Sequence, residues 1–224
     1  MARASVARRV AALMALCVAP TGVLSETAHA EGDPWCDMLE PGEAGAVDCA
    51  LEGGPGVLFF DYETDEYGAG TMTLIQTTYE GGERITSDPV VIEGVSAQAP
   101  GFRDINLDGV EDLFIPVSEG MVNTTFAVWQ QDADAVYQPS GYISGFGIDG
   151  FENKGELIIS AERINAAQYA ETAQLLDQDG FVQVYEMLVD YAEQSCTITD
   201  TDGIDAQGLN EDALIADCED REWE

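Results

Sequence analysis

Short stretches rich in β-branched and aromatic residues recur along the chain, and glycine, aspartate or proline bounds each of them. β-Branched and aromatic side chains fit a pleated, half-buried surface, whereas glycine, aspartate and proline mark turns. The pattern predicts strands over residues 57–62, 70–79, 89–94, 112–117, 123–131, 156–163, 168–176 and 181–189. Strands that follow one another without intervening helices are typical of antiparallel sheets.

The same pattern sets the limits of the predicted domain. Residues 31–56 are rich in glycine, proline and acids, and we expect an irregular N-terminal arm there. A β domain is expected over 57–192, followed by an acidic C-terminal segment over 193–224. Within that segment a short helix is expected near 211–217, with Asn210 as its N-cap.

One part of the strand prediction has an alternative. Residues 177–180 read as the turn of a hairpin that joins the last two strands. The stretch 165–176, however, is rich in alanine and glutamine and also fits a helix.

The first 30 residues have the pattern of a cleavable signal peptide. Three arginines precede the apolar stretch 10–19, which is too short to span a bilayer. Ala28-His29-Ala30 then supplies the small-x-small pattern that signal peptidase needs, so we expect cleavage after Ala30. The alternative is an apolar N-terminal helix that stays attached. Cleavage implies a product in the periplasm or the extracellular medium, with no membrane insertion after the signal is removed.

Acidic residues far outnumber basic ones, and loss of the signal sharpens the imbalance. The full chain has 8 Lys and Arg against 43 Asp and Glu. Residues 1–30 hold three of the basic residues and one of the acidic ones, which leaves 5 against 42 and a net charge of −37. The single histidine, His29, leaves with the signal. The mature protein can therefore have no Ser-His-Asp triad and no imidazole ligand for zinc.

This charge restricts the partners that the protein can bind. Nucleic acid is excluded, because neutralising phosphates requires clustered lysine and arginine. Cations and basic proteins are the partners that the negative field attracts. Adaptation to a saline habitat would also explain the charge, and the two explanations are compatible.

Four cysteines remain after cleavage: Cys36, Cys49, Cys196 and Cys218. An even number in an exported protein indicates disulfides, and four cysteines allow three connectivities. We favour the local pairs Cys36–Cys49 and Cys196–Cys218, since each closes a short loop at one end of the mature chain. A metal held by four thiolates is disfavoured because the chain has no C-x-x-C spacing.

The stretch 104–112 carries the sharpest chemical signal. Asp104, Asn106, Asp108 and Asp112 follow the pattern D-x-N-x-D-G-x-x-D. Calcium takes six to eight oxygen ligands, and a chain can wrap around it when alternate residues point inward. Gly109 at the sixth position permits the tight turn, and Val110 can offer its backbone carbonyl. We therefore predict a calcium site, with Ile105 and Leu107 between the ligands facing the core.

The loop differs from an EF-hand. The twelfth position counted from Asp104 is Ile115 rather than a bidentate glutamate, and a strand follows Asp112. The alternatives to a calcium site are a turn without a metal or a degenerate site that has lost affinity. Residues 200–205, DTDGID, have a similar composition without the full pattern. That stretch is either a weak second site or a chance feature of so acidic a chain.

Residues 104–113, DINLDGVEDL, resemble the D-x-N-x-D-G-x-x-D-L core of FG-GAP and VCBS-type repeats. Propellers repeat this core many times, whereas here it occurs once, as in exported single-repeat proteins of Gram-negative bacteria. The resemblance covers residues 95–190. It implies a mainly β fold of antiparallel sheets, propeller-blade-like or β-sandwich-like, with irregular disulfide-stapled ends. It also implies calcium ligands at Asp104, Asn106, Asp108 and Asp112 and at the carbonyl of Val110.

Some members of that group are periplasmic inhibitors of lysozyme-like enzymes, including immunity proteins against secreted peptidoglycan hydrolases. The resemblance therefore implies a binding protein whose basic partner is a lysozyme-like hydrolase, and not an enzyme. Among the inhibitor motifs of the group, Ser140-Gly141-Tyr142 is the one candidate counterpart, and it also fits an ordinary turn. The alternative functions are a calcium-stiffened cell-surface or adhesion module and a carboxylate-dependent glycoside hydrolase.

Overall fold

The computed structural model describes residues 33–39, 47–53, 56–65, 70–80, 83–96, 98–177, 180–221 and 223. The expected signal peptide, 1–30, lies outside the described residues. Residues from Glu31 to Glu224 form one compact unit. Within the described ranges, no helix is both long enough and apolar enough to cross a membrane.

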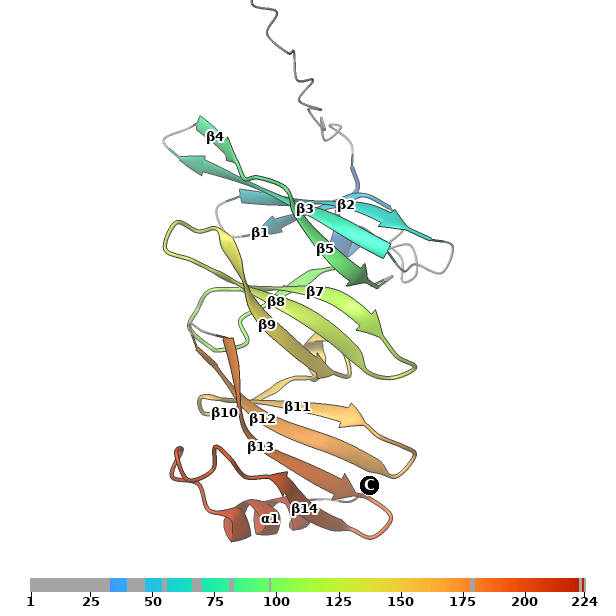
Figure 1. Cartoon of the computed structure of the whole chain (residues 1–224), viewed down its shortest axis with the longest axis vertical. Coiled ribbons are helices and arrows are strands. Elements are labelled where there is room, and N and C mark those ends of the chain that lie inside the picture. The colour runs from blue at the N-terminus through green and yellow to red at the C-terminus, as the bar shows by residue number, and fades with distance from the viewer. Residues whose placement is uncertain are drawn as a thin grey trace, which may run out of the picture. The chain divides into compact units, whose positions relative to one another are not determined.

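The described strands form three antiparallel sheets that follow one another in chain order (Figure 1). The first sheet contains β1 (Cys49–Gly53), β2 (Gly56–Thr64), β3 (Gly70–Glu80), β4 (Glu83–Thr86) and β5 (Val90–Val95). The middle sheet has the order β6 (Gly101–Arg103), β7 (Asp112–Glu119), β8 (Thr124–Gln131) and β9 (Tyr137–Gly145). The third has the order β10 (Glu152–Lys154), β11 (Leu157–Arg163), β12 (Gln168–Asp177), β13 (Gly180–Asp190) and β14 (Ser195–Asp200). Short 3-10 helices span Cys36–Met38 and Ile148–Gly150, and α1 spans Glu211–Glu219.

The mainly β prediction is confirmed. The eight predicted strands correspond to β2, β3, β5, β7, β8, β11, β12 and β13. The stretch that also fitted a helix forms most of β12, and β12 pairs with β13 down to Asp177 opposite Gly180. The turn between them lies outside the described residues. The predicted helix is α1, whose first turn is capped where Asn210 Oδ1 accepts from the Ala213 N–H at 2.9 Å.

Six strands were not predicted: β1, β4, β6, β9, β10 and β14. β1 lies within the stretch expected to form an irregular arm. β9 contains Pro139 and Gly141, which normally interrupt a strand, but it is an edge strand where proline is tolerated. The register of β8 and β9 shifts between Val128 and Trp129, so a bulge absorbs the irregular residues.

The middle sheet is buried on both faces. One face packs on the first sheet in a core that joins Phe60 and Leu74 to Leu113 and Trp129. The other face packs toward the third sheet through Phe114, Phe126, Val128, Ile143, Phe151 and Ile158. This two-sided burial explains the continuous apolar run at the start of β7, where alternation with polar residues is lost.

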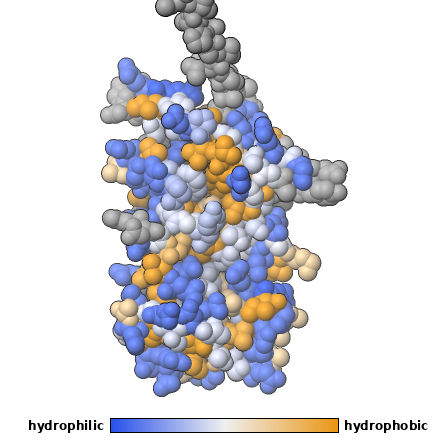
Figure 2. All heavy atoms as spheres, in the orientation of Figure 1, coloured by the Kyte–Doolittle hydropathy of each residue, from blue (hydrophilic) through white to orange (hydrophobic). Residues whose placement is uncertain are grey.

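Acidic and other polar residues make up much of the exposed surface. Figure 2 shows hydrophilic residues spread over one face, with patches of hydrophobic residues between them. A surface of this kind, on a chain with a formal charge of −35, keeps copies of the protein apart by electrostatic repulsion.

Both predicted disulfides are confirmed. Cys36 is bonded to Cys49 and Cys196 to Cys218, with sequence separations of 13 and 22. The first disulfide joins the N-terminal 3-10 helix to β1, and the second joins β14 to α1. Disulfides persist in oxidising compartments, so the two bonds are consistent with an exported protein.

Candidate metal centre

The predicted ligands lie together in one connection of the middle sheet. Residues 104–111 join β6 to β7, and Asp112 is the first residue of β7. β6 and β7 are antiparallel, with Arg103 directly opposite Asp112. The pairing of β6 with β7 therefore holds the two ends of the loop side by side.

Groups outside the predicted ligand set anchor the loop. Arg103 donates to two backbone carbonyls in the connection between β9 and β10. Asn153 Nδ2 donates to the carbonyl of Ile105 at 2.7 Å, and the Tyr137 hydroxyl donates to the carbonyl of Glu111 at 3.2 Å. The bonds from Asn153 and Tyr137 hold the backbone of the loop and do not use its acidic side chains.

The backbone conformation of the loop agrees with the sequence prediction at Gly109 and differs from it at Leu107. Gly109 has a φ of 89°, in the region that glycine adopts without strain. Ile105 is fully buried in the core, as predicted. Leu107 was predicted to face the core as well, but this prediction is wrong, because its side chain is 63% exposed. Its φ of 58° turns the chain at this point and directs the side chain to solvent.

The side-chain oxygens of the loop face its own backbone. The two oxygens of Asp104 accept from the N–H groups of Asp108 and Gly109 at 3.1 and 3.0 Å. Asn106 Oδ1 accepts from the same Asp108 N–H at 3.2 Å. Asp108 Oδ1 accepts from the Val110 N–H at 2.8 Å. These local bonds fold the loop into a tight turn in which the side chains of Asp104, Asn106 and Asp108 accept from its backbone N–H groups.

Asp112 is the buried member of the set. Its side chain is 2% exposed, and its Oδ2 accepts from the Ile105 N–H at 3.1 Å. The pKa of this carboxyl is raised to about 7, mainly by burial; the bond from the Ile105 N–H lowers the pKa, and the charges of Asp108 and Asp104 raise it. A buried carboxylate beside two others is costly unless a positive charge compensates it.

The chemistry of these residues fits calcium, since carboxylate, amide and carbonyl oxygens are the hard ligands that this ion prefers. Among the residues that the structure describes, no three Asp, Glu, His or Cys side chains are gathered closely enough to hold an ion by themselves. Asp108 Oδ2 instead accepts from Asn106 Nδ2 at 2.9 Å. A bound cation would replace this bond, draw the carboxylates together, and use the Asn106 amide oxygen and the Val110 carbonyl as well. Its contribution would be structural, because it would neutralise the loop and fix it between β6 and β7.

In the absence of metal, the protein should resist urea better at about pH 6 than at about pH 8. The folded state raises the pKa of Asp112 from 3.8 to about 7. The stability that this group contributes is therefore fully present below the unfolded pKa and is lost as the pH rises through about 7. Urea midpoints measured with a chelator present test this. Asp112→Asn cannot titrate and should lose most of the difference, so an unchanged pH dependence in this variant would contradict the prediction.

An open hollow of about 600 Å³ adjoins the loop. Asn106 and Asp108 line it together with Asp132 and Asp177, which come from other connections and strands. Asp132 accepts from the N–H groups of two neighbours in its own turn and from Gln138 Nε2 at 3.1 Å. Sequence reasoning missed this residue, because only the pairing of the strands brings it beside the loop.

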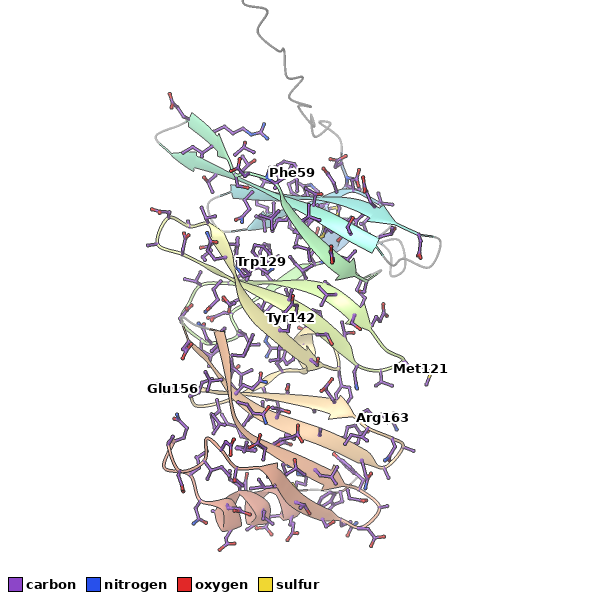
Figure 3. All side chains as sticks on the ribbon, in the orientation of Figure 1. Phe59, Met121, Trp129, Tyr142, Glu156 and Arg163 are labelled. Carbon is purple, nitrogen blue, oxygen red and sulfur yellow. A yellow bond between two sulfur atoms is a disulfide. The ribbon has the colours of Figure 1, made fainter. Side chains whose placement is uncertain are left out.

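The other two stretches singled out in the sequence have different settings. Ser140-Gly141-Tyr142 lies within β9 and is not a turn, and Tyr142, labelled on the middle sheet in Figure 3, is exposed. Residues 200–205 begin at the last residue of β14, and in this stretch the Gly203 N–H donates to the carbonyl of Val184 at 3.0 Å and Ile204 is buried. Packing against β13 is therefore enough to explain the shape of this second acidic loop.

The chain has little similarity to known proteins. No protein-family model matches the chain, and no curated protein matches it. A solved structure described as that of a Xanthomonas type IV secretion system related protein is similar, with 14% identity and a TM-score of 0.46. The match covers 74% of this chain and 93% of that one. At this identity and TM-score the likeness carries no inference about function.

Proposed function

We propose that the chain is an exported calcium-binding protein of the FG-GAP/VCBS-like type, located in the periplasm or the extracellular medium. The ligands of one ion would be the side chains of Asp104, Asn106, Asp108 and Asp112 and the carbonyl of Val110. The observation that carries this proposal is the buried carboxylate of Asp112, which lies with the charges of Asp104 and Asp108 at a glycine turn. A divalent cation is the simplest group that would compensate this charge.

The second part of the proposal is a binding role without a catalytic step. The partner would be a basic protein, such as a lysozyme-like peptidoglycan hydrolase that this chain inhibits. Two features support a basic partner: the net charge of the chain, and the hollow beside the loop that Asp108, Asp132 and Asp177 line. Complementary charge speeds association and orients the encounter. In this arrangement, calcium would hold the rim of the hollow in one conformation.

Binding of a basic lysozyme should be detectable by isothermal titration calorimetry at low salt in the presence of calcium. Raising the ionic strength from about 20 to about 200 mM should weaken it by about tenfold or more, because salt screens exposed charges. Asp132→Asn, at the rim of the hollow, should weaken binding more than Asp205→Asn, an exposed acid on the connection that follows β14.

Two outcomes would count against this partner. If lysozyme does not associate at low salt, the proposed partner class is wrong, and a surface or adhesion module becomes the better account. If it associates with an affinity that salt leaves unchanged, the attraction is not electrostatic.

A further inference from the structure

A second hollow, of about 450 Å³, opens beside the third sheet and the C-terminal helix. It lies over β10, β11 and β12, and residues from the α1 end of the chain complete its wall. Both charged and aromatic side chains line it. It shares no lining residue with the hollow beside the calcium loop.

The charges in this pocket are unusual for so acidic a protein. Beyond residue 30 the chain has five basic residues, and Lys154 and Arg221 both line this pocket. Each is paired: Arg221 lies 3.2 Å from Glu171, and Lys154 lies 3.6 Å from Asp217. Glu152 is the fifth charged residue of the lining, so the pocket is close to neutral. Donors and acceptors are therefore present together without a strong net field.

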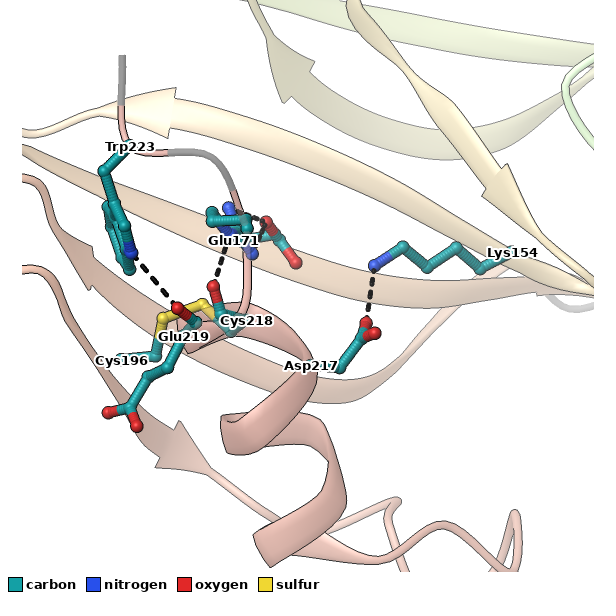
Figure 4. Close-up of a disulfide and its surroundings, with 8 residues drawn as sticks. Lys154, Glu171, Cys196, Asp217, Cys218, Glu219 and Trp223 are labelled. Atoms are coloured by element: carbon teal, nitrogen blue, oxygen red, sulfur yellow. Dashed lines mark hydrogen bonds and ion pairs between the residues drawn. A yellow bond between two sulfur atoms is a disulfide. The ribbon is translucent and has the colours of Figure 1, made fainter.

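Two charged side chains of the pocket, Arg221 and Glu171, are held in place (Figure 4). Arg221 donates through Nε to the carbonyl of Cys218 at 2.8 Å and through both terminal nitrogens to Glu171 Oε2 at 3.2 Å. Cys218 is itself fixed by its disulfide to Cys196. Arg221 contacts Oε2 of Glu171, and Glu171 also lines the pocket. Groups fixed in this way lose little entropy when a ligand binds.

Aromatic rings border the same pocket. Phe146 and Tyr191 line it and are 40% and 38% exposed. They belong to a row of edge-to-face contacts in which Phe146 meets Tyr169 at 5.5 Å, Tyr169 meets Tyr191 at 5.2 Å, and Tyr191 meets Trp223 at 5.3 Å. Arg163, labelled on the third sheet in Figure 3, lies 5.7 Å from the Tyr169 ring centroid. The row holds partly exposed aromatic surface in a fixed orientation.

We propose that this pocket binds a neutral oligosaccharide. The C–H face of a sugar ring packs on exposed aromatic surface such as that of Phe146 and Tyr191, while its hydroxyls exchange hydrogen bonds with fixed donors and acceptors such as Arg221 and Glu171. An anionic ligand would meet the negative field of the whole chain. A cationic ligand would find that two of the three carboxylates of the pocket already have basic partners. A ligand rich in hydroxyls but without charge avoids both penalties.

Calorimetric titration of the purified, oxidised protein with tri-N-acetylchitotriose, cellotriose and maltotriose tests this inference. At least one of the three should bind, and Tyr191→Ala should weaken its binding by about tenfold, which corresponds to about 1.4 kcal/mol. Phe146→Ala is the second variant and should act in the same direction. Tyr142→Ala is the matched control, since it removes an exposed tyrosine from the middle sheet.

Melting temperatures show whether each variant is folded. If Tyr191→Ala fails to fold, Phe146→Ala decides the result. The inference is overturned if none of the three sugars binds at millimolar concentration. It is also overturned if a sugar binds and the folded pocket variants keep the affinity of the wild type. Neither result depends on the calcium loop, so the sugar-binding inference and the proposed calcium-binding function can fail independently of each other.

Discussion

Calcium should raise the melting temperature of the metal-stripped protein by about 5 to 10 °C. A ligand that binds only the folded state stabilises it by about 2.7 kcal/mol at a hundred times its dissociation constant. For a domain of this size, each kcal/mol shifts the melting temperature by about 2 to 4 °C. Magnesium at equal ionic strength should have a smaller effect, because it requires a strict octahedral geometry and keeps its waters. Circular dichroism melts in the two salts measure the difference.

Two variants separate the loop from general charge screening. Asp108→Ala should remove the calcium-selective part of the rise and leave the response common to both ions. Asp108 is exposed in the structure, so the substitution opens no cavity in the core. Asp202→Ala, in the other acidic loop, is the matched control and should respond to calcium as the wild type does. A full calcium response in Asp108→Ala would mean that the ion binds elsewhere.

Removing the Cys196–Cys218 disulfide should lower the free energy of unfolding by about 3 kcal/mol. The bond closes a loop with a sequence separation of 22, so it restricts the unfolded chain strongly. It also ties α1 to β14, where both cysteines are buried in a hydrophobic cluster with Val189 and Ile204. Urea unfolding of the double variant Cys196→Ser and Cys218→Ser measures the loss.

The other disulfide is the control for this prediction. Cys36–Cys49 closes a shorter loop, with a separation of 13, so the entropic argument gives it a slightly smaller effect. A double variant of Cys196 and Cys218 that unfolds at the same urea concentration as the wild type would contradict the prediction. In that case the helix would be held by its packing alone.

The strands that the sequence predicted correctly are those whose residue types favour a β-strand and whose side chains are partly buried in a sheet. Strands such as β3 and β13 are rich in β-branched and aromatic residues, and these types fit a pleated surface wherever it lies in the protein. β9 was missed because Pro139 and Gly141 read as a break, whereas an edge position and a bulge accommodate them. The local disulfides were predictable because short loops connect the paired cysteines.

The loop that carries the predicted ligands could be located from the sequence because its oxygen-bearing residues stand at regular spacing within one short segment. The groups that anchor it could not, since Arg103, Tyr137 and Asn153 act through tertiary contacts with no sequence spacing of their own. The pocket beside α1 was missed for the same reason. Its aromatic residues, Phe146 and Tyr191, come from separate connections and meet only when the third sheet forms.

The central claim is that the loop between β6 and β7 binds calcium, and equilibrium binding tests it most directly. Competition with a chromophoric chelator gives both the number of ions bound and their affinity. The account predicts one calcium ion per chain for the wild type and for Asp202→Ala, and none for Asp108→Ala. A wild type that binds no calcium, or an Asp108→Ala variant that still binds one ion with unchanged affinity, would contradict it.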